Sequence, residues 1–313
     1  MDQETTKRTY RLFNKQVHQF GLYLKRISLP GFDGVPIYDV FTFFFKGLSK
    51  GSLNTRASSI AFNFLLALGP AIIFFLTLIP YLPIKDLKSE ILEILNEIIP
   101  KDSYIALESL MDELFIKRSG MHVFGFLIAL FFAEKGINSM IEAFNATYHT
   151  IETRKWLQRR IVSILLVIIL LALVTLALSL LFFSKTGIIK LVEMQIIEVD
   201  FTYYLILAGR WIIITVLTFL SISFLYYLAP ARKSKWKFFS AGSTLATLLT
   251  IVASLGFSYF VNNFAQFDQF FGSISALVAL MLWLNFNALT LLIGFELNAS
   301  ISNARVVYDN NQE

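Results

Sequence analysis

The sequence predicts an all-α, polytopic membrane protein with six transmembrane helices and both termini on the cytoplasmic side. Hydrophobic residues make up 56% of the 313 residues, and charged residues make up only 16%, below the ~25% that is usual in soluble domains. The apolar residues gather in six long segments that are separated by polar stretches. Basic residues are concentrated in alternate connections between these segments, a pattern that orients multi-pass membrane proteins.

Residues 1–56 are predicted to form a cytoplasmic arm. This arm carries nine Lys or Arg residues and a turn rich in proline and glycine near residues 30–34. From Tyr38 to Leu53, phenylalanine side chains alternate with Lys46 and Lys50 at helical spacing. That pattern is typical of an amphipathic helix that lies in the membrane interface.

The membrane domain is expected to cover residues 57–302 and to precede a cytoplasmic tail at 303–313. Its first span contains Gly69 and Pro70, and a proline inside a helix removes a backbone hydrogen bond, which predicts a kink. Residues 84–120 form the longest insertion, with two amphipathic helices that we expect to cap the outer face. The six spans are predicted at about 57–82, 121–145, 161–183, 201–228, 238–261 and 274–297.

The distribution of basic residues decides the predicted orientation. The connections on the side of the termini, including residues 149–160 and 232–237, hold 18 Lys or Arg residues, whereas the connections on the other side hold 7. The excess of positive charge assigns the termini to the cytoplasm. Topology and anionic lipids account for these basic loops, so we expect no nucleic-acid partner.

The apolar part of the predicted second span is too short to cross a bilayer. Met121–Ala133 is apolar apart from His122, which gives about 20 Å of helix against a bilayer core about 30 Å thick. Five polar residues follow at spacings of 4, 4, 3 and 4, and therefore share one helical face. They are Glu134, Asn138, Glu142, Asn145 and His149.

Two interpretations of this polar stripe are open. In the first, it lines a polar cavity inside the bundle, and the other spans shield it from lipid. In the second, the helix leaves the membrane near Ala133 and the stripe is solvated. We favour partial immersion, with Glu134, Lys135 and Asn138 at membrane depth and the remainder in solvent.

Arg210 and Glu296 are further candidates for a substrate pathway. Arg210 lies within the fourth span, where it either reaches the outer headgroups and pairs with a nearby acid, or provides a cation in an outward-facing cavity. Glu296 lies near the cytoplasmic end of the sixth span. It is either a carboxylate hydrogen-bonded to a neighbouring helix or a site of proton coupling. Asn285 and Asn287 are expected to form hydrogen bonds between helices.

Four stretches of the sequence occur in a characteristic order, namely residues 57–70 (ASSIAFNFLLALGP), Gly136 to Tyr148, Tyr227 to Pro230, and Gly272 to Asn298. Together they resemble the YihY/BrkB family of bacterial inner-membrane proteins, for which ribonuclease BN is an older description. The resemblance implies six spans, both ends in the cytoplasm, and a role in transport that includes the export of lipid-like molecules.

These features favour a transporter or exporter of an amphiphilic, lipid-like substrate, with membrane lipids as its surroundings. The sequence has no nucleotide-binding motif, so movement of the substrate is expected to be facilitated or ion-coupled. The alternative is a membrane scaffold that binds envelope partners through residues 84–120 or the basic arm.

We expect no enzyme, no cofactor and no metal site, because there is no cysteine and the three histidines, His18, His122 and His149, lie far apart. Homo-oligomerisation is left open.

Overall fold

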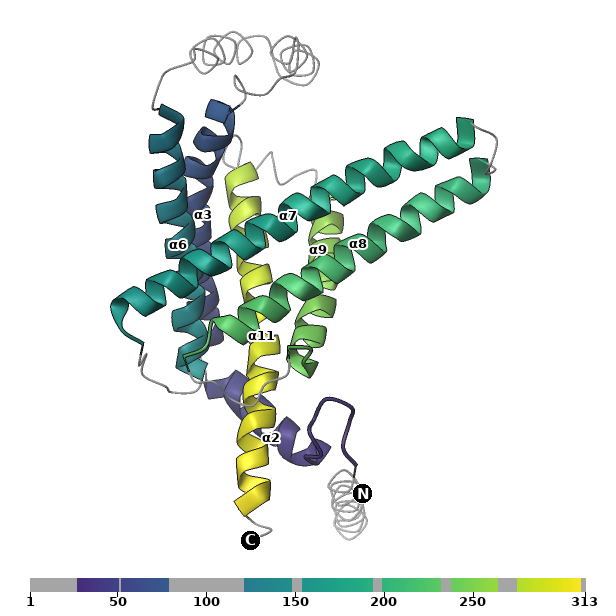
Figure 1. The fold of residues 1–313 in the computed structure, drawn as a ribbon. Helices are drawn as coiled ribbons and strands as arrows, with labels where there is room; N and C mark the ends of the chain where they lie inside the picture. Colours follow the sequence, from purple (N-terminus) through teal and green to yellow (C-terminus); the bar gives the residue numbers. More distant parts are fainter. Residues whose placement is uncertain are drawn as a thin grey trace, which may run out of the picture.

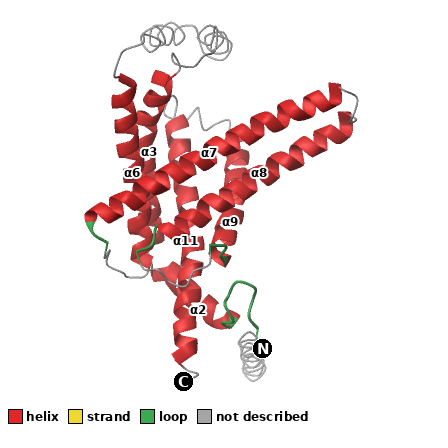
Figure 2. Cartoon of the chain, viewed as in Figure 1, coloured by secondary structure: helices red, strands yellow, loops and turns green. Residues whose placement is uncertain are grey.

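The computed structural model describes residues 27–50, 52–78, 121–147, 154–193, 199–231, 238–263 and 275–310. All the regular secondary structure in these residues is α-helical (Figures 1 and 2). The helices are α2 (Ile37–Lys50), α3 (Leu53–Leu78), α6 (Met121–Thr147), α7 (Trp156–Glu193), α8 (Val199–Leu228), α9 (Ala241–Asn263) and α11 (Ser275–Asn310).

Five of the described helices are long and apolar enough to cross a membrane, namely α6, α7, α8, α9 and α11. Helix α3 overlaps the predicted first span but is not among these five, so a count of six spans stays a prediction. It continues as a helix through Gly69 and Pro70, and the predicted kink there is likewise untested. The predicted cap at 84–120 lies outside the described residues.

The helices form an upright bundle that is crossed by one long hairpin. Helix α3 packs along α6, α9 packs along α11, and α11 also contacts α3. Helices α7 and α8 pair with each other, cross the bundle obliquely and extend beyond it (Figure 1). With 38 residues, α7 is much longer than the predicted span at 161–183. Hydropathy detects only the most apolar stretch of a helix, whereas the helical hydrogen bonds of α7 continue beyond that stretch.

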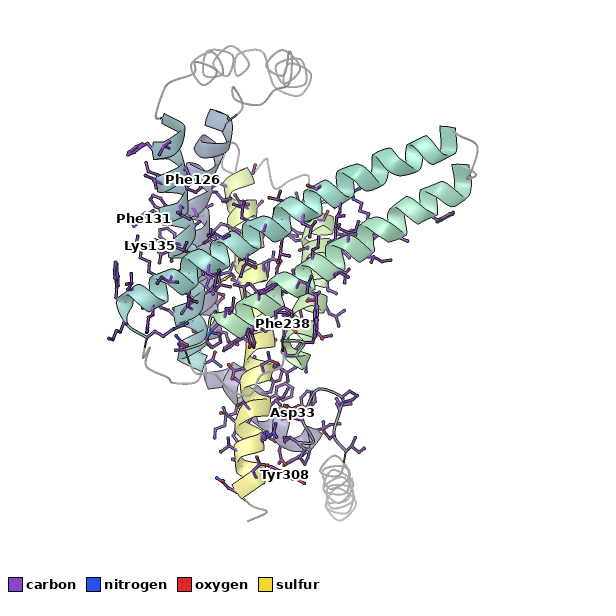
Figure 3. The ribbon with its side chains drawn as sticks, in the orientation of Figure 1. Asp33, Phe126, Phe131, Lys135, Phe238 and Tyr308 are labelled. Carbon is purple, nitrogen blue, oxygen red and sulfur yellow. The ribbon has the colours of Figure 1, made fainter. Side chains whose placement is uncertain are left out.

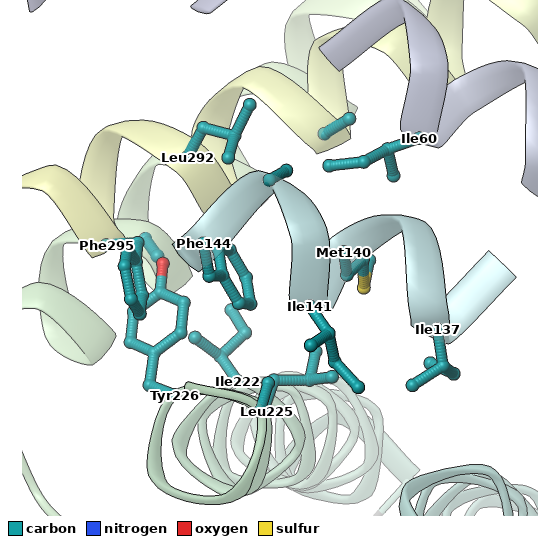
Figure 4. Close-up of a cluster of buried hydrophobic side chains, with 14 of the residues drawn as sticks. Ile60, Ile137, Met140, Ile141, Phe144, Ile222, Leu225, Tyr226, Leu292 and Phe295 are labelled. Atoms are coloured by element: carbon teal, nitrogen blue, oxygen red, sulfur yellow. The ribbon is translucent and has the colours of Figure 1, made fainter. Parts of the chain in front are cut away.

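The core lies where α6, α8 and α11 meet (Figure 4). Phe144 of α6 stacks on Phe295 of α11 with ring centres 4.3 Å apart. Tyr226 of α8 meets both rings edge-on, at 5.6 and 5.5 Å. Its hydroxyl donates a 2.6 Å hydrogen bond to the carbonyl of Leu291, so the buried phenol has a polar partner.

Helices α9 and α11 approach closely at small residues. A Cβ atom added to Gly242 would lie 2.2 Å from the carbonyl oxygen of Gly294, and one added to Gly294 would lie 2.6 Å from the Cβ of Ala246. The absence of larger side chains at these positions therefore lets the two helix backbones pack closely. Asn298 strengthens the contact, because its Oδ1 accepts a 2.8 Å hydrogen bond from the backbone N–H of Gly242.

Helix α2 and the C-terminal part of α11 pack together at one end of the molecule (Figures 1 and 3). Val40 and Phe44 of α2 bury their side chains against Ile301 and Ala304. The predicted tail at 303–313 is thus helical as far as Asn310 and continues α11 without a break. Other rings of α2, on Tyr38, Phe41 and Phe45, are exposed. The position of this helix in the membrane interface stays a prediction.

Candidate functional site

Helix α6 separates an apolar face from a polar one, as its sequence predicts. Ile137, Ile141 and Phe144 on the apolar face are no more than 3% exposed and belong to the core (Figure 4). Along the polar stripe the environment changes with position. Glu134 and Asn145 are buried, whereas Asn138 is half-buried and Glu142 is exposed.

Arg159, in the first turns of α7, joins this polar face. Its Nε donates a hydrogen bond to Oδ1 of Asn138, and its Nη2 forms an ion pair with Oε1 of Glu142. Asn138 Nδ2 also donates to that carboxylate oxygen, at 3.2 Å. The three side chains form a closed network between two helices. From the sequence, Arg159 contributes only to the charge bias, because its partners depend on the packing of α7 against α6.

A pocket of about 310 Å³ lies between α6 and the start of α7, and we call it the α6–α7 groove. It is at the outer edge of the bundle, since Phe131 and Trp156 in its wall are 44% and 71% exposed. Figure 3 shows Phe131 and Lys135 on the outer side of α6. The prediction of a cavity inside the bundle therefore differs from the structure, in which the polar residues border an open groove. Its lining residues are Phe131, Glu134, Lys135, Asn138, Glu142, Trp156, Arg159 and Arg160.

Asn145 belongs to the stripe by spacing but does not line the groove. Its Oδ1 accepts a 2.9 Å hydrogen bond from the backbone N–H of Ala231, just beyond the end of α8. Arg154 binds the same region, because its Nη2 donates to the carbonyl of Ala229 at 2.7 Å. Both side chains therefore stabilise the C-terminal end of α8 through hydrogen bonds. Backbone carbonyls at this end of a helix have no partners within the helix.

Glu296 lies where α2, α3, α6 and α11 meet, and its side chain is buried. It is hydrogen-bonded to Thr147 and lies in the electrostatic field of Arg56. On its other side it faces Gly47, where an added Cβ atom would lie 1.9 Å from the carboxylate Oε1. The bond to Thr147 of α6 is a contact with a neighbouring helix, as the first alternative for Glu296 describes, whereas proton coupling stays a prediction.

Arg56 completes this junction from the first turn of α3. Its Nη1 donates hydrogen bonds to the carbonyl of Ala143 at 2.8 Å and to Oγ1 of Thr147 at 2.7 Å. Its Nε and Nη2 are buried and have no hydrogen-bond partner among the described residues. Sequence reasoning missed Arg56 because it was counted only as a base before the first span.

The remaining candidates lie apart from the groove. Arg210 is exposed on α8 and does not line the groove. Asn285 donates a 3.0 Å hydrogen bond to Ser58 of α3, which confirms its predicted role between helices. Asn287 instead bonds within its own helix, to the carbonyl of Trp283. Within the described part of the chain, no three acidic or histidine side chains gather in a group that could hold a metal ion.

A second, mostly apolar pocket of about 290 Å³ lies where the α7–α8 hairpin crosses α9 and α11. Leu173, Ile214 and Leu291 contribute to its wall, and Thr250 and Asn287 are among its few polar residues. A cavity with this lining suits hydrocarbon rather than a charged group.

Comparison with known proteins identifies relatives that cover most of the chain. The sequence matches the family described as "Virulence factor BrkB" over residues 44–313. The ribonuclease-like protein YfkH of Bacillus subtilis is 29% identical over 259 residues, which cover 82% of this chain and 93% of the relative. A UPF0761 membrane protein of Vibrio campbellii is 21% identical over 264 residues, which cover 83% and 81% of the two chains.

No solved structure matches the chain. The family match covers the described helices from the middle of α2 to the end of α11, including every residue of the groove. The chain is therefore a multi-pass helical membrane protein that belongs to the BrkB family.

Proposed function

We propose that this protein moves an amphiphilic, lipid-like molecule across a bacterial inner membrane, with the polar head of the molecule following the α6–α7 groove. The observation that carries the proposal is a pocket lined by charged residues between α6 and α7. Both helices are apolar enough to cross a membrane, and the pocket lies at the outer edge of the bundle. A groove that opens sideways admits a polar head while the hydrocarbon chains of the same molecule stay in the bilayer.

The polar residues of α6 support this function because they are costly in a membrane. Glu134 is buried in α6, one of the five described helices that are long and apolar enough to cross a membrane. A carboxylate at membrane depth is expected to serve a pathway or a partner. Arg159, Asn138 and Glu142 add groups that can replace water around a passing headgroup. The apolar pocket beside the α7–α8 hairpin offers a separate surface for hydrocarbon chains.

The orientation of the groove follows from the distribution of charge. Helix α7 begins at Trp156, within the basic segment at 149–160, which the positive charge bias assigns to the cytoplasm. The groove then opens at the cytoplasmic end of α6 and α7. Residues 27–36 and the C-terminal end of α11 lie at the same end of the molecule (Figure 1), in keeping with this assignment.

Without a nucleotide-binding motif, transport would be facilitated or coupled to an ion. Glu296 is the group best suited to proton coupling, because it is a buried carboxylate beside Arg56 and Thr147 at a junction of four helices. A proton gained or lost there would change the contacts that hold these helices together.

The test is lipid movement in proteoliposomes. The purified full chain is reconstituted with a trace of fluorescent phospholipid, and the rate of movement between leaflets is read from the access of a membrane-impermeant quencher. Glu134→Gln keeps the size of the side chain but removes its charge, and we expect a rate at least about tenfold lower. Asp309→Asn, the same chemical change at an exposed position of α11, should leave the rate unchanged.

Wild-type protein that moves lipid no faster than protein-free vesicles would exclude the transport function. Binding of envelope partners would then be the better interpretation. A normal rate in Glu134→Gln would remove this residue, and the groove wall that it forms, from the pathway.

A further inference from the structure

We propose that the α6–α7 groove contains a binding site for the phosphate of an anionic lipid headgroup, held by Lys135 and Arg160. The inference rests on the proposed function and deepens it by naming the class of headgroup that the groove accepts. The binding step can be measured without transport, so each can fail separately.

Two cations converge on one aromatic ring in the groove. Lys135 Nζ lies 5.6 Å from the ring centre of Phe131, and the guanidinium carbon of Arg160 lies 6.0 Å from the same centre. Neither cation forms an ion pair within the described part of the chain. Both cations also line the same pocket, so an anion bound in this pocket would be attracted by both of them.

Arg159, unlike Lys135 and Arg160, is already bound to other side chains of the protein and is less available to an anionic ligand. Its guanidinium is engaged by Asn138 and Glu142, so the carboxylate of Glu142 is already neutralised inside the groove. The other carboxylate of the wall belongs to Glu134, which is buried. Three cations and two carboxylates line the groove, which leaves it with a formal charge of +1 before a ligand binds.

The rim of the groove favours a lipid over a free anion. Trp156 is 71% exposed and packs under Arg160, whose guanidinium carbon lies 5.3 Å from the tryptophan ring centre. The neighbouring Leu157 is 60% exposed and Phe131 is 44% exposed. Tryptophan is enriched at the level of lipid headgroups, where one part of its ring meets hydrocarbon and the other meets water. Cations surrounded by exposed apolar side chains therefore fit a phosphate that carries hydrocarbon chains.

Trp156 provides a direct probe of occupancy. The chain has four tryptophans, so Trp211, Trp236 and Trp283 are replaced by Phe to leave Trp156 as the only one. The full-length protein is placed in phosphatidylcholine vesicles that contain an equal small fraction of brominated phosphatidylglycerol or brominated phosphatidylcholine. Bromine quenches tryptophan at short range, so the ratio of the two quenching constants measures the preference for the anionic headgroup.

We expect phosphatidylglycerol to quench Trp156 more strongly, by a ratio that falls about fivefold for each cation removed. Lys135→Gln and Arg160→Gln should each lower the ratio, and the double variant should bring it close to one. Arg160→Lys, which keeps the charge, should preserve most of the preference. Lys46→Gln changes an exposed cation of α2 outside the groove and serves as the matched control.

Equal quenching by the two lipids in the unsubstituted single-tryptophan protein would overturn the proposal, as would a preference that survives the double variant. A response of Trp156 to inorganic phosphate in lipid-free detergent, without a preference for phosphatidylglycerol, would identify a site for free phosphate and overturn the lipid assignment. If a variant fails to fold, raising the ionic strength with the parent protein provides a second measurement, because screening should lower a charge-based preference.

The outcomes also separate binding from transport. A preference for phosphatidylglycerol without movement between leaflets supports the binding site and excludes the transport function. Transport that persists in the double variant, with no headgroup preference, overturns the binding site alone.

Discussion

Helix α6 contributes to two arginine–glutamate networks that differ in their burial. On its polar face, Glu142 pairs with Arg159 of α7, and the two side chains are 60% and 25% exposed. At its C-terminal end, Thr147 binds Arg56 and Glu296 in a junction where Glu296 is only 6% exposed. The same two residue types therefore occur in an open groove and in a closed junction.

The difference suggests a division of roles between the two regions. An exposed ion pair contributes little to stability, and its members can exchange partners with a ligand. A buried carboxylate must keep its partners, because an uncompensated charge in the interior is costly. We therefore expect changes at the junction to affect stability, and changes in the groove to affect ligand binding.

The largest expected effect follows from removal of one partner at the junction. Glu296→Ala leaves Arg56 without its nearby carboxylate and should lower the free energy of unfolding by about 2–4 kcal/mol. Unfolding in mixed detergent micelles measures this loss. The double variant Arg56→Met/Glu296→Met, which removes both charges, should be more stable than Glu296→Ala. Wild-type stability in the single variant would contradict the view that the junction is held by charge.

A somewhat smaller loss is expected from crowding the same carboxylate. Gly47→Ala places a methyl group against Oε1 of Glu296, and the helices must separate or the carboxylate must move. We expect a loss of about 1–3 kcal/mol in the same unfolding measurement. Gly209→Ala is the matched control, because a Cβ atom there would meet nothing within 4 Å. Equal stabilities of the two variants would show that the contact at Gly47 is not tight.

The smallest effect on stability is expected in the groove. Glu142→Gln removes the exposed ion pair and should change the free energy of unfolding by less than about 1 kcal/mol. The same change releases Arg159 and makes the groove more positive, so the preference of Trp156 for brominated phosphatidylglycerol should rise. A large loss of stability together with an unchanged lipid preference would reverse the roles assigned to the two regions.

Much of the fold can be predicted from local patterns. The apolar face of α6 follows from helical periodicity, and the structure buries Ile137, Ile141 and Phe144 as expected. The predicted spans overlap helices in the structure, because long apolar segments satisfy their backbone only as helices in a membrane. Their lengths are predicted less well: α11 continues to Asn310, where its last turns are stabilised by packing on α2 rather than by lipid.

The candidate site could be predicted only in part. Glu134, Asn138 and Glu142 can be predicted because they share one helical face, and Lys135 because it lies at the end of the apolar run. All four line the groove. Asn145 has the same spacing but bonds to the end of α8. Nothing in the local sequence separates it from the others, because its partner is 86 residues away along the chain.

The sequence by itself determined that the chain is a helical membrane protein and that α6 carries a polar stripe, since composition and periodicity are local properties. Only the tertiary structure decided that the stripe borders an open groove, that Arg159 joins it, and that Arg56 and Glu296 meet at a buried junction. The physical reason is that an ion pair depends on distance in space. Helix packing sets this distance between residues that are far apart in the chain.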